Sequence, residues 1–337
     1  MGSAVSDAEQ VQSSGEPPAK PSATRRLVHI VGAVLVVVVL PALLMYAVAG
    51  KLGVSAMFVG VLLGAVGAKL GGTRRMLYVA PVVGLAAGLG AFTAYGWWWV
   101  AVLAAAGVIT GAGIGFGWLP PLLMIPYAAT FVTPVSTVTD AVIYGVVVAI
   151  ATLYGIVLAR RFGAPPTVDG DRRSPAVAAA TAVVFGAVLG GSAAIGVALG
   201  WTEPYWVPEP ILILVLYIIT GKRDRIRGKT IGTVVGIAAA IPVAIISPSA
   251  TVLATVGTIV FIIALTQTKR YWLMYGLYTF SVVLLLAAPG KVGFEAEERG
   301  LQILVGIGLL VIGLAVIHAL GRWLENRHPQ TEPATAA

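Results

Sequence analysis

The sequence predicts an all-α integral membrane protein, and three observations support this fold class. Hydrophobic residues make up 58% of the chain and charged residues only 11%, against roughly a quarter charged residues in a soluble domain. The apolar residues form runs close to the ~20 residues that a helix needs to cross a bilayer. Lys and Arg collect between alternate runs, as they do in cytoplasmic loops. Little of the chain is left for a separate soluble domain.

The chain begins with a polar tail, followed by a first group of apolar runs. Residues 1–24 are rich in Ser, Pro, Glu and Gln and are predicted to form a disordered cytoplasmic tail. Residues 25–161 are predicted to form a first transmembrane repeat. Its candidate spans are Val28–Ala49, Val54–Leu70, Met76–Tyr95, Trp97–Trp118, Leu119–Thr133 and Val138–Ala159.

A polar linker at residues 162–175 separates this group from a second one. Residues 176–322 are predicted to form a second repeat, and residues 323–337 a cytoplasmic tail. The candidate spans of the second repeat are Ala176–Gly200, Tyr205–Ile219, Thr230–Ile246, Ala250–Thr266, Trp272–Ala288 and Leu301–Leu320. The prediction is therefore about twelve spans. Ten remain possible, because Leu119–Thr133 is short and rich in proline, which breaks helices.

The distribution of basic residues predicts which side of the membrane each loop occupies. With the N-terminus inside, nearly all Lys and Arg residues fall in inner segments, and only Lys51, Lys291 and Arg299 fall outside. This asymmetry is the positive-inside pattern. It predicts a multi-pass protein of the inner (plasma) membrane with both termini in the cytoplasm.

The two halves also resemble each other in sequence. The stretch "RRMLYVAPVVGLAAG" from Arg74 aligns with "IRGKTIGTVVGIAAA" from Ile226, which superposes Arg75 on Arg227. Six spans in each unit is an even number. The halves are therefore predicted to be parallel repeats related by an axis along the membrane normal.

Several classes of function are disfavoured by the residues present. The chain contains no cysteine and only three scattered histidines, so no metal site is predicted. Gly228-Lys229-Thr230 resembles the end of a phosphate-binding loop, but Arg223 stands where that motif requires glycine. The segment before it is a membrane span and not a strand. We therefore expect no enzyme activity, no cofactor and no binding of nucleic acid.

One stretch carries a family resemblance. The run "EPYWVPEPILILVLYIITGKRDRIRGKTIGTVVG" resembles the fusaric acid resistance-like (FUSC) family of aromatic acid exporters. The matching residues are Tyr205, Trp206, Lys229 where the family usually has Arg, Gly232, Thr233 and Gly236. Arg299 before "LQILVGIG" resembles the Arg that opens the last span of the family. The resemblance implies a membrane transporter.

The chain also departs from the family pattern. Glu209 and Pro210 stand where the family tends to have Thr, and the first half has Ala80-Pro81 in place of Gly-Thr. These departures concern the substrate more than the fold. Plant aluminium-activated malate transporters have a similar architecture, so a channel mechanism stays open.

The resemblance and the charge asymmetry together predict a proton-coupled exporter of small organic anions, such as aromatic carboxylates, that uses the proton gradient. A passive organic-anion channel and a non-transporting membrane scaffold are the alternatives, and a homodimer is possible. We expect an inner vestibule formed by Arg75, Arg227 and Lys229. The outer exit is predicted to contain Glu209 beside Tyr205 and Trp206, where prolines interrupt the helix.

The remaining candidate residues each have two interpretations. Gly232, Thr233 and Gly236 are expected to pack helices closely more than to touch substrate. Asp140 is expected to cap a helix, or else to lie at the outer mouth. Arg299 follows three glutamates of its own segment, so a surface ion pair is favoured over a substrate anchor.

Overall fold

The computed structural model describes residues 40–161, 172–219, 223–246, 249–267, 270–286 and 292–327, and every regular element in these ranges is a helix. The predicted tails, most of the first candidate span and most of the linker lie outside the described residues. The α-helices are α2 (Leu40–Gly71), α3 (Thr73–Thr93), α4 (Trp97–Ala112), α5 (Leu119–Leu122), α6 (Met124–Thr130), α7 (Val138–Arg161), α8 (Pro175–Ala198), α9 (Pro208–Ile219), α10 (Arg223–Ile246), α11 (Ala250–Thr266), α12 (Tyr271–Leu286) and α13 (Val292–Arg327). Two short 3-10 helices, η2 (Gly113–Phe116) and η3 (Pro204–Trp206), accompany them.

The chain is a multi-pass helical membrane protein. Among the described residues, six helical stretches are long and apolar enough to cross a membrane. They are Pro41–Gly71, Thr73–Thr93, Trp97–Phe116, Val138–Arg161, Pro175–Ala198 and Glu298–Trp323. Large apolar side chains such as Phe58, Leu85 and Trp98 are exposed on the outside of this bundle, where lipid would cover them. Twelve spans, the repeats and the cytoplasmic termini stay predictions.

Two breaks in the helices coincide with features of the sequence. Helix α2 is bent at Ala49 and Gly50, between the first two predicted spans, and Gly50 has a φ of 59°. Glycine adopts such a positive φ without steric cost. The proline-rich segment Leu119–Thr133 forms α5 and α6 instead of one continuous helix. At 7 residues α6 is far shorter than the ~20 residues of a membrane span, and all of it is buried.

Two hydrogen bonds connect the ends of helices in the first half of the chain. The hydroxyls of Ser55 in α2 and Thr133 after α6 lie 2.6 Å apart. Nη1 of Arg75 in α3 donates to the carbonyl oxygen of Gly117, directly after η2, at 3.2 Å.

Small residues allow the long helices to pack closely. Helix α4 lies against α8, and a Cβ atom on Gly107 would stand 2.8 Å from Cα of Gly186. Helix α3 lies against α7, and a Cβ atom on Gly145 would stand 2.7 Å from the carbonyl oxygen of Gly84. Close approach at glycine is the usual way in which membrane helices associate.

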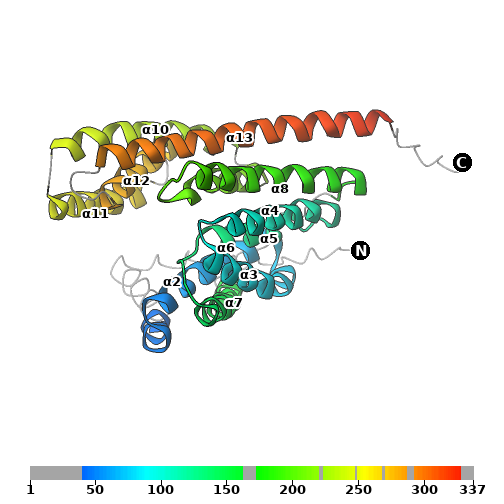
Figure 1. Ribbon diagram of the computed structural model, residues 1–337, viewed down its shortest axis with the longest axis horizontal. Coiled ribbons are helices and arrows are strands. Elements are labelled where there is room, and N and C mark those ends of the chain that lie inside the picture. Colours follow the sequence, from blue (N-terminus) through cyan, green and yellow to red (C-terminus); the bar gives the residue numbers. More distant parts are fainter. Residues whose placement is uncertain are drawn as a thin grey trace, which may run out of the picture.

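The described residues form two separate buried cores. The larger core joins α2 to α9 with α13, and Leu103, Leu189 and Leu310 belong to it. The smaller core belongs to α10, α11 and α12 and consists of Ala240, Leu253, Val283 and Leu284. In Figure 1 these three helices gather around one end of α13, while α8 lies along a later part of the same helix. The two cores therefore do not coincide with the two predicted repeats.

Candidate functional site

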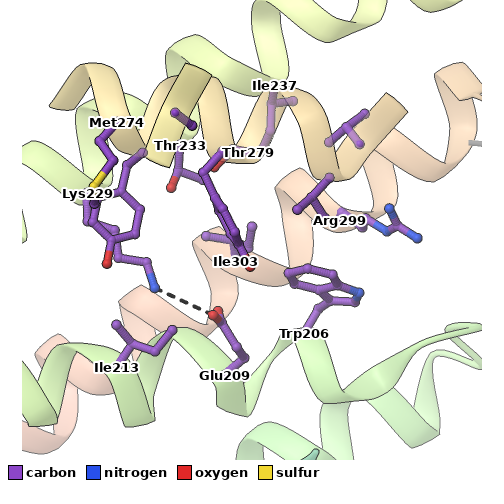
Figure 2. Close-up of a pocket in the computed structure, with 15 residues that line it drawn as sticks. Trp206, Glu209, Ile213, Lys229, Thr233, Ile237, Met274, Thr279, Arg299 and Ile303 are labelled. Atoms are coloured by element: carbon purple, nitrogen blue, oxygen red, sulfur yellow. Dashed lines mark ion pairs between the residues drawn. The ribbon is translucent and has the colours of Figure 1, made fainter. Parts of the chain in front are cut away.

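A cavity of about 270 Å³ lies between the helices of the two cores. Helices α9 and α13 form one side, and α10 and α12 form most of the other (Figure 2). The walls are mostly apolar, with a few charged and aromatic side chains among them. The lining includes Trp206, Glu209, Ile213, Lys229, Thr233, Met274, Tyr275, Tyr278, Thr279, Arg299 and Ile303.

Helix α9, which forms part of one wall of the cavity, is short. It has 12 residues and is therefore about 18 Å long, against ~30 Å for the hydrocarbon core. Pro208 at its first position suits a helix start, because proline has no N–H to donate. The preceding chain folds back through η3, so the first turn of α9 is buried against α13. A Cβ atom on Gly306 of α13 would stand 2.2 Å from the carbonyl oxygen of Val207.

Glu209 lies in this first turn of α9 and faces Lys229 of α10 across the cavity. Oε1 of Glu209 and Nζ of Lys229 are 3.6 Å apart, and the two side chains are only 14% and 10% exposed. Figure 2 shows the two groups pointing toward each other. A negative charge in the first turn of a helix is favourable, because free N–H groups give that end a partial positive charge.

The ammonium group of Lys229 is not hydrogen-bonded by the described residues. Its Nζ atom is buried and has no hydrogen-bond partner there, since 3.6 Å exceeds the usual N–H···O range of about 2.7–3.2 Å. The same atom lies 5.7 Å from the centre of the Tyr275 ring, which gives a weaker cation–π attraction. Apart from the ion pair with Glu209, the described residues therefore offer this ammonium group no hydrogen-bond acceptor.

A second ion pair closes the other end of the cavity. Nη2 of Arg299 donates to Oε2 of Glu203 at 2.9 Å, and Nε1 of Trp206 donates to the same oxygen at 2.8 Å. The guanidinium group also lies 5.4 Å from the centre of the Trp206 ring. Unlike Lys229, Arg299 is therefore held by a direct, charge-assisted hydrogen bond.

Tyr205 belongs to an aromatic cluster behind this wall and does not line the cavity itself. Its ring stacks on Trp206 at 5.4 Å and on Tyr95 at 5.9 Å between centroids. Tyr95 lies in the turn between α3 and α4 with a φ of 64°. Burial, followed by the charge of Glu203, raises the pKa of Tyr95 to about 12, so its hydroxyl stays neutral. The cluster connects the cavity wall to the larger core.

Five residues singled out in the sequence meet at the cavity, namely Trp206, Glu209, Lys229, Thr233 and Arg299. Gly232 and Gly236 lie beside it and contact α12. Cβ atoms there would stand 2.3 Å from the carbonyl oxygen of Trp272 and 2.4 Å from that of Gly276. The glycines set the distance between α10 and α12, and Thr233 faces the cavity.

Three other predicted residues lie away from the cavity. Arg75 binds the loop after η2, as described above. Arg227 is exposed and does not line the cavity. Asp140 accepts a hydrogen bond at 2.7 Å from the hydroxyl of Thr137, which in turn accepts one at 3.0 Å from the backbone N–H of Asp140. Thr137 is therefore the residue that caps α7, and Asp140, which was expected to be the cap, lies three residues later and bonds to it.

Two expectations about position differ from the structure. Lys229 was expected at an inner entrance and Glu209 at an outer exit, whereas the ion pair brings them together. Arg299 was expected to pair on the surface with glutamates of its own segment. It is only 8% exposed and bonds to Glu203, which is far away in sequence.

The contributions of Glu203 and of α12 were not predicted. Met274, Tyr275, Tyr278 and Thr279 form one face of α12 toward the cavity. Their spacing of three and four residues is that of a helix face, so the pattern was present in the sequence. The pairing of Glu203 with Arg299 joins positions 96 apart and had no local signal.

Comparison with known families identifies the segment that forms the cavity. Residues 189–313 match the family described as fusaric acid resistance protein-like, which confirms the resemblance noted in the sequence. All the residues that line the cavity fall within this segment. No curated protein and no solved structure matches the chain.

Proposed function

We propose that this membrane protein, whose residues 189–313 match the fusaric acid resistance protein-like family, is a proton-coupled exporter of small organic anions. Aromatic carboxylates are the foremost candidates. The cavity is the proposed binding site, and the plasma membrane is the proposed location.

The observation that carries this proposal is the ammonium group of Lys229. It is buried, it points into the cavity, and its N–H donors lack hydrogen-bond partners among the described residues. A substrate carboxylate is a strong acceptor for such donors, because both partners of the bond are charged. Buried polar groups are otherwise nearly always hydrogen-bonded, so a ligand that supplies the acceptor would be stabilising.

The walls of the cavity favour an aromatic ring next to that carboxylate. Trp206, Tyr275 and Tyr278 present aromatic surface, and Ile213 and Ile303 present aliphatic surface. Aromatic rings pack well against such walls in offset or edge-on arrangements. A volume of about 270 Å³ is close to the lower end of the ~300–1,000 Å³ that is typical of ligand pockets. The substrate is therefore expected to be small.

The proposed route runs from the cytoplasm to the outer side. Basic inner residues, including Arg75 and Arg227, would raise the local concentration of anions. Lys229 would then bind the carboxylate inside the cavity. Release would follow past Trp206 and Arg299, at the end of the cavity that the predicted topology places outside.

Replacing Lys229 by glutamine is expected to weaken binding of benzoate, a simple aromatic carboxylate, more than tenfold. This loss corresponds to about 1.4 kcal/mol and is a modest value for one charge-assisted contact. Isothermal titration of purified protein in lipid nanodiscs would measure it. Lys51→Gln is the matched control, since Lys51 is an exposed lysine of α2 and should bind benzoate like the wild type.

Benzoate binding that is equal in Lys229→Gln and in the wild type would contradict the proposed site. Transport assays separate the alternative functions. Benzoate currents across a planar bilayer without any proton dependence would indicate a passive channel. A protein that binds no organic anion but copurifies with a stoichiometric partner would indicate a scaffold.

A further inference from the structure

A second cavity lies between α8 and α13, which run side by side (Figure 1). Its volume is about 490 Å³, and residues of α4, η2, α5 and α9 complete its walls. The lining residues of α13 run from Leu310 to Arg322, a distance of about 18 Å at 1.5 Å per residue. Half of the hydrocarbon core of a bilayer is about 15 Å thick. The cavity therefore has about the depth of one lipid leaflet.

Most of the wall of this cavity is apolar. Val184 of α8, Ile218 of α9 and Ile317 of α13 contribute aliphatic surface from three sides. Thr181 of α8 also lines the cavity, but its hydroxyl donates to the carbonyl oxygen of Val177 in the same helix at 2.8 Å. The hydrogen bond of this hydroxyl is thus already made, and the wall suits a hydrocarbon chain.

Basic side chains gather at one end of the same cavity. Arg173 directly precedes the capping residue of α8, and His318 and Arg322 lie in the later part of α13. The backbone N–H of Arg173 donates to the carbonyl oxygen of Ile114 at 3.3 Å, which ties this residue to η2. Among the described residues none forms an ion pair with Arg173 or Arg322. Guanidinium groups bind phosphate strongly, because both partners are charged and the geometry is complementary.

The position of the basic end favours a lipid of one leaflet. The predicted topology places this end in the cytoplasm, because the linker before α8 and the tail after α13 are both predicted inner segments. Anionic lipids give the cytoplasmic leaflet its negative surface potential. Leu314 lines the cavity and is 38% exposed, so the cavity opens toward the surrounding lipid. A lipid molecule can therefore enter from the side of the bundle.

We infer that this cavity binds an anionic phospholipid of the cytoplasmic leaflet. The phosphate accepts hydrogen bonds from Arg173 and Arg322, and an acyl chain lies along the apolar wall between α8 and α13. Basic pockets between transmembrane helices on the cytoplasmic side are typical sites for anionic head groups. The bound lipid also contacts α9, the helix that carries Glu209 into the first cavity. The site itself does not depend on the proposed transport function.

Native mass spectrometry of the full-length protein, released from detergent micelles with added lipid, would measure this binding. The wild type should bind dioleoyl phosphatidylglycerol about tenfold more tightly than dioleoyl phosphatidylcholine, whose choline group is repelled by the arginines. Arg173→Gln combined with Arg322→Gln should weaken phosphatidylglycerol binding about 30-fold, because two charged donors to the phosphate are lost. Arg160→Gln combined with Arg161→Gln is the matched control. It removes two exposed arginines at the end of α7 and should bind phosphatidylglycerol like the wild type.

A second pair of variants tests the place of the acyl chain. In Val184→Phe the larger side chain occupies part of the cavity and should weaken phosphatidylglycerol binding about tenfold, since space for the chain is lost. Val183→Phe is the control, because this neighbouring residue is 67% exposed and does not line the cavity. Its affinity should equal that of the wild type. Glycerol phosphate, which has the phosphate but no acyl chain, should not displace the lipid at equal concentration.

Several results would overturn the inference. Equal affinity of the wild type for the two lipids, or an affinity for phosphatidylglycerol that survives the loss of Arg173 and Arg322, would exclude a site for an anionic head group. Displacement by equimolar glycerol phosphate would indicate a site for free phosphate. Equal affinity in Val184→Phe and Val183→Phe would place the acyl chain elsewhere. A lipid-free dimer in the mass spectrum would show that a second copy of the chain covers the cavity instead.

Discussion

Replacing Gly232 by alanine is expected to destabilise the packing of α10 against α12 by about 3 kcal/mol, the upper end of the usual range for overpacking. The added Cβ atom would stand 2.3 Å from the carbonyl oxygen of Trp272 and 2.8 Å from the backbone nitrogen of Gly276. These are backbone atoms of a helix and cannot turn aside as a flexible side chain can. The two helices must separate, and the cavity that they form must change shape.

Thermal unfolding of detergent-solubilised protein would measure this effect, and benzoate titration would show the loss of the cavity. Gly308→Ala is the matched control, because it makes the same substitution in α13 at a glycine with nothing within 4 Å of the added atom. It should unfold at the wild-type temperature or slightly above, since alanine favours helices. A Gly232→Ala protein as stable as the control would contradict the close contact of α10 and α12.

Replacing Arg299 by methionine should destabilise the protein by about 3 kcal/mol, because it leaves the Glu203 carboxylate without its cation. Breaking a buried ion pair usually costs about 3–5 kcal/mol, and the lower figure applies here because the Glu203 side chain is 34% exposed. Unfolding with denaturant would give the value. The affected pair is part of the contact between α13 and η3, so the cavity end that contains Trp206 should loosen as well.

The double variant Arg299→Met with Glu203→Gln tests the reason for this loss. Glutamine still accepts the hydrogen bond from Trp206 but carries no charge, so the double variant should recover most of the stability. Replacing both members of a buried pair is often nearly neutral. A double variant that loses the sum of the two single effects would show that the electrostatic account of the pair is wrong.

The sequence was informative about where helices lie and less so about how far they extend. The predicted run Val138–Ala159 agrees closely with α7, because a membrane span and its flanking charges are marked locally. The basic stretch before Thr230 was expected to be a loop, but it forms the first two turns of α10. Lys and Arg favour helices, and this extension carries Lys229 into the bundle. Hydropathy alone does not mark such a helix start.

The meeting of Glu209 and Lys229 could not be predicted for a related reason. Predicting it requires knowing that α9 is only 12 residues long and begins deep in the bundle. In the sequence, Tyr205–Ile219 reads as one continuous span with Glu209 near its outer end. The break is a tertiary feature, because the chain before Pro208 folds back against α13.

The division into two cores could not be predicted from the sequence either. Helices that are apolar on all sides indicate burial in lipid or protein but do not mark the face that packs on a neighbour. The larger core includes Leu103 of the first predicted repeat and Leu189 of the second. This contact depends on α4 and α8 meeting across the linker, for which no local pattern exists.

Because the two cores are separate, substrate specificity can change during evolution without changes in the larger core. Met274, Tyr278 and Thr279 line the cavity from α12, whose buried neighbours belong to the small core. Substituting these three side chains would change which substrate binds, while the packing of α2 to α9 would stay the same. Related proteins that transport different organic acids are therefore expected to share the larger core. They should differ mainly in the residues on the face of α12 that lines the cavity.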